Sequence, residues 1–276
     1  MAQQRACAHG GVLVMRNEDL DRSRCKGEFV EAMQNDLGWF GLRWDEGPDV
    51  GGPFAPYSQS ERLSQYQAAF EKLQAGGFVY PCRCSRQDVL RALQAPHAGE
   101  EEPIYPGTCR PKGNPVLQAE SRKLAADEIG HSIGNARAEN RMNWRFRVPD
   151  AETISFIDGH YGQQQFVAGK DFGDFVVWRH DNVPAYQLAV VVDDAAMQIT
   201  EVVRGADLLI STARQLLLFR ALRLPAPRFY HCPLVRDEAG IRLAKRHEAL
   251  SLRALRARGF QPEQLRESWA HPMNSC

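Results

Sequence analysis

The sequence predicts an α/β fold in which a parallel sheet carries helices on both faces and a subdomain is inserted between its two parts. Short apolar runs alternate with amphipathic segments near both ends of the chain, which is typical of strand-helix-strand units. A stretch with three cysteines, within residues 81–165, interrupts this alternation. The length of 276 residues, 43% of them apolar, allows one large core or two smaller ones.

One strand and two helices are expected in the first block. The apolar run 12–16 suits a buried strand, and the apolar spacing in 27–37 predicts the helix that follows it. Ser58 and Glu61 have the spacing of a capping box, so the second helix is expected to start there. The glycine pair 76–77 is expected to end it.

The middle block contains the cysteines, a polar helical segment and two expected strands. The strands cover 143–148 and 153–158, and Asp158 with Gly159 is expected to turn the chain back. The third block returns to alternation and closes with a basic helical tail. Its expected elements are strands at 174–179, 199–203 and 229–235 and helices at 184–194 and 211–222, the last capped by Ser211 or Thr212.

Composition and charge narrow the class of protein. The chain has 34 basic and 34 acidic residues, so nucleic-acid binding would need a local basic surface, and the basic stretch 241–258 offers one. The sequence shows no membrane-spanning run and no signal peptide. Its seven cysteines lack the spacing of a disulfide framework. These features predict a cytoplasmic protein without membrane association.

The cysteines of the middle block suggest a metal site. Cys82, Cys84 and Cys109 supply three sulfur donors, and zinc takes four donors in a tetrahedron. The first two are closer together than paired zinc ligands usually are, so three unrelated thiols are an alternative interpretation. Ligand frequencies favour a histidine as the fourth donor. The candidates are His97, Tyr105 and one of the glutamates at 100–102.

Long segments of the chain resemble the catalytic domain of class I glutamyl-tRNA synthetases. They read VLVMRNEDLDRSR, LGWFGLRWDEGP, YSQSERLSQYQAAFEKLQAGGFVYPCRCS and VPAYQLAVVVDDAAMQITEVVRGADLLISTARQ. The resemblance implies a Rossmann-like parallel sheet with an inserted zinc-containing subdomain. The implied parts are 1–80, the first part of the nucleotide-binding catalytic domain; 81–165, a zinc-binding subdomain of the acceptor type; 166–240, the second half of the catalytic domain; and 241–276, a KMSKS-like loop and basic helical tail.

Within this superfamily, the cysteine pattern is similar to that of the short glutamyl-queuosine tRNA(Asp) synthetases. That similarity implies that one structural zinc ion is held by a tyrosine and three cysteines, rather than by a histidine. Because the chain stops soon after the motif IRLAKR, no anticodon-binding domain is expected. The implied ligands are Cys82, Cys84, Tyr105 and Cys109.

The resemblance also implies an activity and its partners. Enzymes of this group activate L-glutamate with ATP and Mg²⁺ and transfer it to the queuosine base in the anticodon loop of tRNA(Asp). We therefore expect a cytoplasmic, monomeric ligase of the aminoacyl-tRNA synthetase type. Two alternatives remain, a catalytic fragment of a conventional glutamyl-tRNA synthetase and a catalytically impaired, synthetase-derived RNA-binding protein.

The family motifs imply roles for four residues. Glu18 would face the ammonium group of glutamate, and Tyr186 and Arg204 would line the glutamate pocket. Lys245 would contact ATP from the segment RLAKR, which takes the place of the KMSKS loop although its first lysine and its serine are replaced. Without the resemblance, Glu18 suits a solvated turn, Tyr186 an apolar core and Lys245 a solvated basic face. Arg204 follows a predicted strand, at the place where α/β sheets bind ligands.

Family members open with a strand and a HIGH-type signature that binds ATP. The sequence shows no counterpart of this signature before VLVMRNED. If the chain is complete as printed, we expect severely impaired activation of glutamate.

Overall fold

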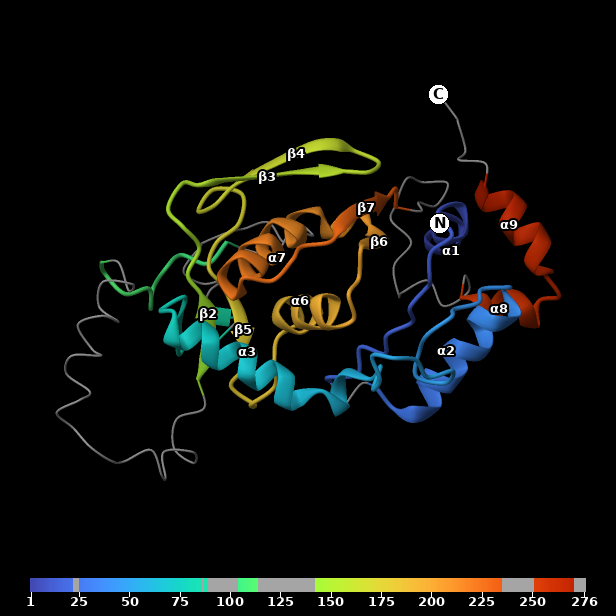
Figure 1. The fold of residues 1–276 in the computed structure, drawn as a ribbon, viewed down its shortest axis with the longest axis horizontal. Coiled ribbons are helices and arrows are strands. Elements are labelled where there is room, and N and C mark those ends of the chain that lie inside the picture. The colour runs from blue at the N-terminus through green and yellow to red at the C-terminus, as the bar shows by residue number, and fades with distance from the viewer. Residues whose placement is uncertain (22–24, 86, 89–103, 114–141, 235–250, 271–276) are drawn as a thin grey trace. The chain divides into compact units, whose positions relative to one another are not determined.

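The computed structural model describes residues 1–21, 25–85, 87–88, 104–113, 142–234 and 251–270. The chain divides into two compact units (Figure 1). The central unit is Arg62–Cys232, and the terminal unit combines Met1–Glu61 with Pro233–Cys276. The polar segment expected after Cys109 and the RLAKR segment lie outside the described residues.

Two sheets form the framework of the central unit. The first has three antiparallel strands in the order β1-β2-β5, and the second has four strands in the order β4-β3-β7-β6. In the second sheet, β7 runs parallel to both of its neighbours, whereas β3 and β4 form an antiparallel hairpin. The strands are β1 Val79–Cys82, β2 Asn143–Phe146, β3 Thr153–Asp158, β4 Gly162–Val167, β5 Phe175–Trp178, β6 Glu201–Gly205 and β7 Arg228–Cys232.

The prediction of a parallel sheet is therefore only partly correct. Parallel pairing is confirmed for β3, β6 and β7, which belong to a mixed sheet. The short connection between β3 and β4 permits only antiparallel pairing, because a parallel neighbour needs a long crossover. Strand β2 pairs with β1 and β5 instead of continuing the sheet of β3, so the described strands form two sheets rather than one.

Among the described residues, three α-helices cover the strands of the central unit: α3 Leu63–Ala75, α6 Tyr186–Ala196 and α7 Leu209–Leu222. Helix α6 packs between α3 and α7 (Figure 1). Tyr66, Phe70 and Leu73 of α3 are buried, whereas Leu63, which shares their helical spacing, is 40% exposed. Phe70 stacks on Trp178 with ring centroids 4.9 Å apart. This packing joins α3 to the three-stranded sheet.

A buried ion pair also joins α3 to α6. Arg62 Nε donates to Asp193 Oδ1 at 2.7 Å, and both side chains are almost fully buried. The hydroxyl of Tyr66 donates to the same carboxylate. Because a buried carboxylate needs compensating donors, these contacts fix the position of α6 against α3.

The predicted starts of two helices are wrong. Ser58 precedes a short 3-10 turn, η1 (Gln59–Glu61), and α3 begins at Leu63 without a side-chain cap. The backbone of Glu61 donates to the Ser58 carbonyl, so these residues form the turn instead of a capping box. Helix α7 begins at Leu209, before the expected caps Ser211 and Thr212, which are buried inside it.

The terminal unit contains four described α-helices: α1 Ala2–Ala8, α2 Gly27–Trp39, α8 Leu252–Ala257 and α9 Pro262–Ala270. The predicted helix at 27–37 and the helical tail are confirmed. The strand predicted at 12–16 is wrong, because this run forms only isolated bridges, such as Val14 to Glu46. Its backbone is nevertheless extended and bonded, with the Met15 amide donating to the Glu46 carbonyl at 2.8 Å.

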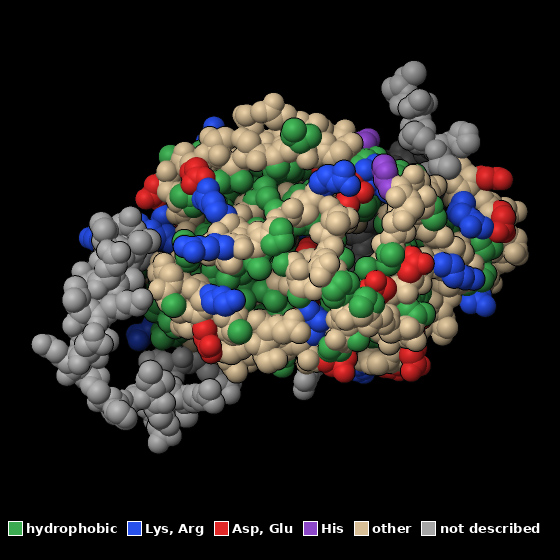
Figure 2. Space-filling model, viewed as in Figure 1, with side chains coloured by type: hydrophobic (Ala, Val, Ile, Leu, Met, Phe, Trp, Pro, Cys, Tyr) green, Lys and Arg blue, Asp and Glu red, His purple; other side chains and the backbone are tan. Residues whose placement is uncertain are grey.

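The surface carries both signs of charge. On the face shown in Figure 2, basic and acidic side chains of the described residues are interspersed, in keeping with equal totals of 34 each. None of the helices that the structure describes has the length and apolarity needed to cross a membrane.

Candidate functional site

The structure brings together the three cysteines of the middle block. Cys82 ends β1, Cys84 follows it, and Cys109 lies in the described segment 104–113. Their sulfur atoms all lie within 4.8 Å of one another, and the Sγ atoms of Cys84 and Cys109 are 3.6 Å apart. The three thiols therefore form one cluster.

Tyr105 completes this cluster. Its hydroxyl oxygen lies 3.4 Å from Cys82 Sγ and 3.6 Å from Cys84 Sγ. The backbone amide of Cys109 donates to the same oxygen at 2.7 Å, which turns the phenol toward the sulfurs. His97 and the glutamates at 100–102 lie outside the described residues. We call Cys82, Cys84, Tyr105 and Cys109 the thiol cluster.

The spacing of the thiol cluster fits a tetrahedral zinc ion. Zinc bonds of about 2.3 Å to sulfur and about 2.0 Å to oxygen place the sulfurs about 3.8 Å apart and the oxygen about 3.5 Å from each sulfur. The 3.6 Å between the sulfurs of Cys84 and Cys109, and the 3.4 and 3.6 Å from the Tyr105 oxygen to the sulfurs of Cys82 and Cys84, are close to these values. Three sulfur donors and one oxygen also suit the ligand preferences of zinc.

The side chain of Arg145 in β2 supports the thiol cluster from the three-stranded sheet. Its Nε donates to Cys82 Sγ at 3.3 Å, and its guanidinium carbon lies 3.9 Å from the ring centroid of Tyr105. A second donor of the guanidinium bonds the Asp174 carbonyl at 3.0 Å. Arg145 therefore orients two members of the cluster at once.

Close packing at Gly173 also holds the segment of Tyr105. A Cβ atom at residue 173 would lie 3.0 Å from the Tyr105 backbone nitrogen and 3.2 Å from its carbonyl oxygen. Both contacts are to backbone, which cannot move aside as a flexible side chain can. The absence of a side chain at Gly173 thus allows the loop of Tyr105 to approach the backbone just before β5.

The pKa values of Tyr105, Cys84 and Cys109 are shifted in different directions. Burial raises the pKa of the Tyr105 phenol and of the Cys84 thiol. Burial also acts to raise the pKa of Cys109, but a backbone hydrogen bond at Arg83 and hydrogen bonds within the cluster outweigh it and lower this pKa to about 7. Because the thiolate is the form that binds metal, the lowered pKa favours Cys109 as a ligand over Cys84, whose pKa is raised.

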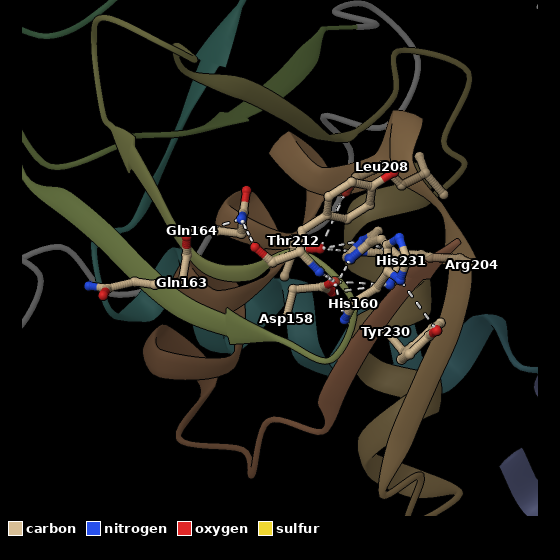
Figure 3. Close-up of polar contacts among 10 residues, drawn as sticks. Asp158, His160, Gln163, Gln164, Arg204, Leu208, Thr212, Tyr230 and His231 are labelled. Carbon is tan, nitrogen blue, oxygen red and sulfur yellow. Dashed lines mark hydrogen bonds and ion pairs between the residues drawn. The ribbon is translucent and has the colours of Figure 1, made fainter. Parts of the chain in front are cut away.

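A second polar group surrounds Arg204, near the carboxyl end of β6 (Figure 3). Its Nε donates to His231 Nε2 at 3.2 Å, and its Nη2 donates to Thr212 Oγ1 at 2.6 Å. Arg204 and His231 are register partners on the parallel strands β6 and β7. The strand pairing therefore brings the imidazole beside the guanidinium.

Asp158 lies on the other side of His231, at the end of β3. Its Oδ2 is 2.6 Å from His231 Nδ1, and the backbone amide of His231 donates to the same oxygen at 3.1 Å. The amides of His160 and Tyr161, in the β3–β4 turn, donate to Oδ1 at 3.0 and 2.9 Å. We call Asp158, Arg204, Thr212 and His231 the Arg204 network.

The electrostatics of this network favour a neutral imidazole and an ionised carboxylate. Burial, aided by the charge of Arg204, lowers the pKa of His231 although Asp158 acts in the opposite direction. Burial acts to raise the pKa of Asp158, but hydrogen bonds from Tyr161, His231 and His160 outweigh it and lower that pKa.

The remaining predicted site residues are placed as follows. Tyr186 is the first residue of α6 and is 38% exposed, so it is not the core residue that an apolar helix suggested. Glu18 belongs to the terminal unit, where Arg16 pairs with it at 3.0 Å. Lys245 lies outside the described residues.

Sequence reasoning missed Asp158, Thr212 and His231 as members of a site. Asp158 was expected only to turn the chain, and Thr212 only to cap a helix. A signal was present for His231, since a histidine inside the apolar run FYHCPLV at a strand position is a buried titratable group.

The chain is similar to known synthetases along almost its whole length. Residues 1–270 match the family described as tRNA synthetases class I (E and Q), catalytic domain. A protein of Symbiobacterium thermophilum named glutamyl-Q tRNA(Asp) synthetase is 49% identical over 92% of this chain and 74% of its own length. One of Nitratidesulfovibrio vulgaris with the same name is 45% identical over 91% of this chain and 72% of its own length.

Longer relatives match as well. Glutamate–tRNA ligase 1 of Halorhodospira halophila is 40% identical over 98% of this chain, which covers 54% of that ligase. The crystal structure of glutamate-tRNA synthetase from Elizabethkingia anophelis aligns with a TM-score of 0.66 at 28% identity, over 91% of this chain. The chain spans about half the length of that solved protein, 48%.

Proposed function

This chain belongs to the class I tRNA synthetases for glutamate and glutamine, and we propose that it activates L-glutamate with ATP and transfers it to the queuosine base of tRNA(Asp). The observation that carries the proposal is the identity of 49% and 45% to two glutamyl-Q tRNA(Asp) synthetases, each over more than nine tenths of this chain. Two proteins named glutamate–tRNA ligase match at 41% and 40%.

The proposed reaction has two steps. In the first, a carboxylate oxygen of glutamate attacks the α-phosphorus of ATP, and pyrophosphate leaves. In the second, a nucleophile of the modified base attacks the acyl carbon, and AMP leaves. Negative charge develops on the phosphates in the first step, so the site must supply cations, for which we propose Lys245 and Mg²⁺.

We propose that Arg204 and Tyr186 bind glutamate from the central unit and that Glu18 binds its ammonium group. A guanidinium suits a carboxylate because its donors can engage both oxygens. A carboxylate suits an ammonium because it accepts hydrogen bonds and carries the opposite charge.

We propose that the thiol cluster holds one zinc ion with a structural role, within a zinc-binding subdomain at 81–165. Four protein ligands occupy all coordination positions of a tetrahedral zinc ion and leave none for water or substrate. The fit of the sulfur and phenol spacing supports this proposal. The metal would stabilise the segment of Tyr105 and Cys109 rather than take part in glutamyl transfer.

The test is glutamate-dependent exchange of labelled pyrophosphate into ATP without tRNA, followed by transfer of labelled glutamate to tRNA. We expect exchange, and labelling of queuosine-containing tRNA(Asp) but not of the same tRNA lacking queuosine. Labelling of tRNA(Glu) instead would assign the chain to the glutamate–tRNA ligases. Tight tRNA binding without any exchange would contradict the enzymatic proposal and favour an RNA-binding protein.

A further inference from the structure

We propose that His231 is a positioning residue, which, with Asp158 and Thr212, sets the guanidinium of Arg204 for a carboxylate of glutamate. The inference rests on the proposed function, because it assumes that Arg204 binds the substrate. It adds three residues, from β3, β7 and α7, to the residues that the family motifs point to (Figure 3).

The first step of the argument is the direction of the hydrogen bonds at Arg204. Its guanidinium can only donate, so both of its partners in the network must accept. Thr212 Oγ1 can accept from Nη2 at 2.6 Å because a hydroxyl oxygen has lone pairs. His231 Nε2 can accept from Nε at 3.2 Å only if that ring nitrogen carries no proton.

Asp158 determines which ring nitrogen of His231 carries the proton. Its carboxylate already accepts three backbone N–H groups, which favours the ionised, acceptor-only form. The contact of 2.6 Å to Nδ1 therefore needs a proton on Nδ1. In the neutral imidazole, a proton on Nδ1 leaves Nε2 as an acceptor, which is the state that Arg204 requires.

Burial makes this arrangement necessary. His231 and Thr212 are 0% exposed and Asp158 is 2% exposed, so water cannot replace a missing partner. A doubly protonated His231 would direct an N–H group at Arg204 and place two cations together. The charged and titratable groups around the imidazole are Asp158 from β3 and Arg204 from β6, with His160 and Tyr230 bonding each other at 3.5 Å nearby.

A purely structural role for His231 predicts different behaviour. A histidine that only filled the core would affect stability, and its tautomer would not matter for glutamate. The positioning role predicts that changes around His231 weaken glutamate binding while ATP binding is retained. It also predicts that the proton on Nδ1 and the hydrogen bond of the Arg204 Nε–H depend on each other.

The variants Thr212→Val, Thr212→Ser and Asp158→Asn separate these possibilities. T212V removes the hydroxyl that accepts from Arg204 and contacts His231 Nε2 and the Leu208 carbonyl, at nearly constant shape. We expect the Kd for glutamate to rise about tenfold, the usual effect of losing a hydrogen bond to a charged group. T212S restores the hydroxyl and should restore the affinity. S211A is the matched control, because Ser211 is a buried hydroxyl one residue earlier that accepts from Gln187 instead.

Nitrogen NMR of the histidine-labelled and arginine-labelled chain reads the tautomer directly. We expect Nδ1 to be protonated in the wild type, and D158N to move the proton to Nε2 because an amide can donate to Nδ1. The Arg204 Nε–H signal, identified by its absence in R204K, should lose its hydrogen-bonded shift in D158N. Thermal melts of each variant report whether it folds.

Each outcome bears on the inference. A wild-type Nε2–H tautomer, or a D158N variant that changes tautomer without weakening glutamate binding, would overturn it. A wild type that binds no glutamate would overturn the inference together with the proposed function, whereas a wild type that binds glutamate and keeps an unchanged Arg204 signal in D158N would overturn the inference alone.

Discussion

The thiol cluster and the Arg204 network are both built from polar groups in the central unit, yet they differ in how their hydrogen bonds are completed. The four groups of the thiol cluster all lose a proton when they bind metal. Without a bound cation, these groups have no shared positive partner for their donor atoms. The Arg204 network contains a cation, an anion and two neutral groups that can act as donor or acceptor. The contacts of Arg204 with His231 and Thr212, and of His231 with Asp158, each pair a donor with an acceptor.

The two sites also differ in how far apart their members lie along the sequence. Cys84 and Cys109 are 25 residues apart, whereas Asp158 and His231 are separated by 73. The thiol cluster takes two of its members from the loop segment 104–113. The Arg204 network takes three of its members from strands β3, β6 and β7 of one sheet. We therefore expect the cluster to depend on a ligand for its order, and the network to depend on the fold.

The largest expected effect is loss of metal from the thiol cluster. The variant Cys109→Ser removes a thiol whose pKa is lowered, so we expect bound zinc to fall from about one ion per chain to less than about half, with a lower Tm. Metal analysis of the purified protein measures this. Cys7→Ser is the matched control, since Cys7 is an exposed cysteine in α1. Full zinc content in C109S would show that the ligand assignment is wrong.

A smaller effect is expected from the side chain that supports the cluster. Replacing Arg145 by Met keeps most of the volume but removes the donor to Cys82 and the cation above Tyr105. Outer contacts of this kind usually change metal affinity by about 10- to 100-fold, and competition with a chelator would measure the Kd for zinc. Arg179→Met is the control, because Arg179 pairs with Asp181 on the surface. Equal affinities in R145M and R179M would contradict a supporting role.

The smallest effect is expected from pH acting on the Arg204 network. The folded chain lowers the pKa of His231, so the unfolded chain binds a proton there first as the pH falls. The free energy of unfolding should therefore be fully supported above the ordinary histidine pKa of about 6.5 and decrease as the pH falls below it. The lowered pKa of Asp158 acts in the same direction at lower pH, below the ordinary aspartate value of about 3.9.

Denaturant unfolding of the wild type and H231Q between neutral and mildly acid pH measures this dependence. The variant lacks the titrating ring, so its stability should fall less over this range, although its stability at neutral pH is lower. A steeper decline in H231Q than in the wild type would be the opposite of what the network predicts.

Local patterns in the sequence predicted the local parts of the fold. The helix predicted at 27–37 corresponds to α2, and the turn after Asp158 was expected where β3 ends. The thiol cluster was accessible too, because cysteines are rare and their spacing is distinctive. The choice of Tyr105 over His97 needed the family resemblance, since ligand frequencies favour histidine.

Contacts across many residues were not accessible from the sequence. Strand β2 lies between β1 and β5, and no property of the sequence NWRF specifies those neighbours. The extended run that includes Val14 has the composition of a strand but lacks a continuous partner among the described residues. The Arg204 network is hidden for the same reason, because its members are common residue types that the sheet brings together.

Gly173 has a consequence for how variants of this chain are interpreted. It carries no donor atom and no charge, and it lies far along the sequence from Cys82 and Cys84. Even so, a methyl group there would press on the backbone of Tyr105. In a mutational survey that measures zinc retention, substitutions at Gly173 should therefore have effects similar to substitutions of the ligands. Positions that affect zinc binding would then be identified by their proximity in space rather than by their residue chemistry.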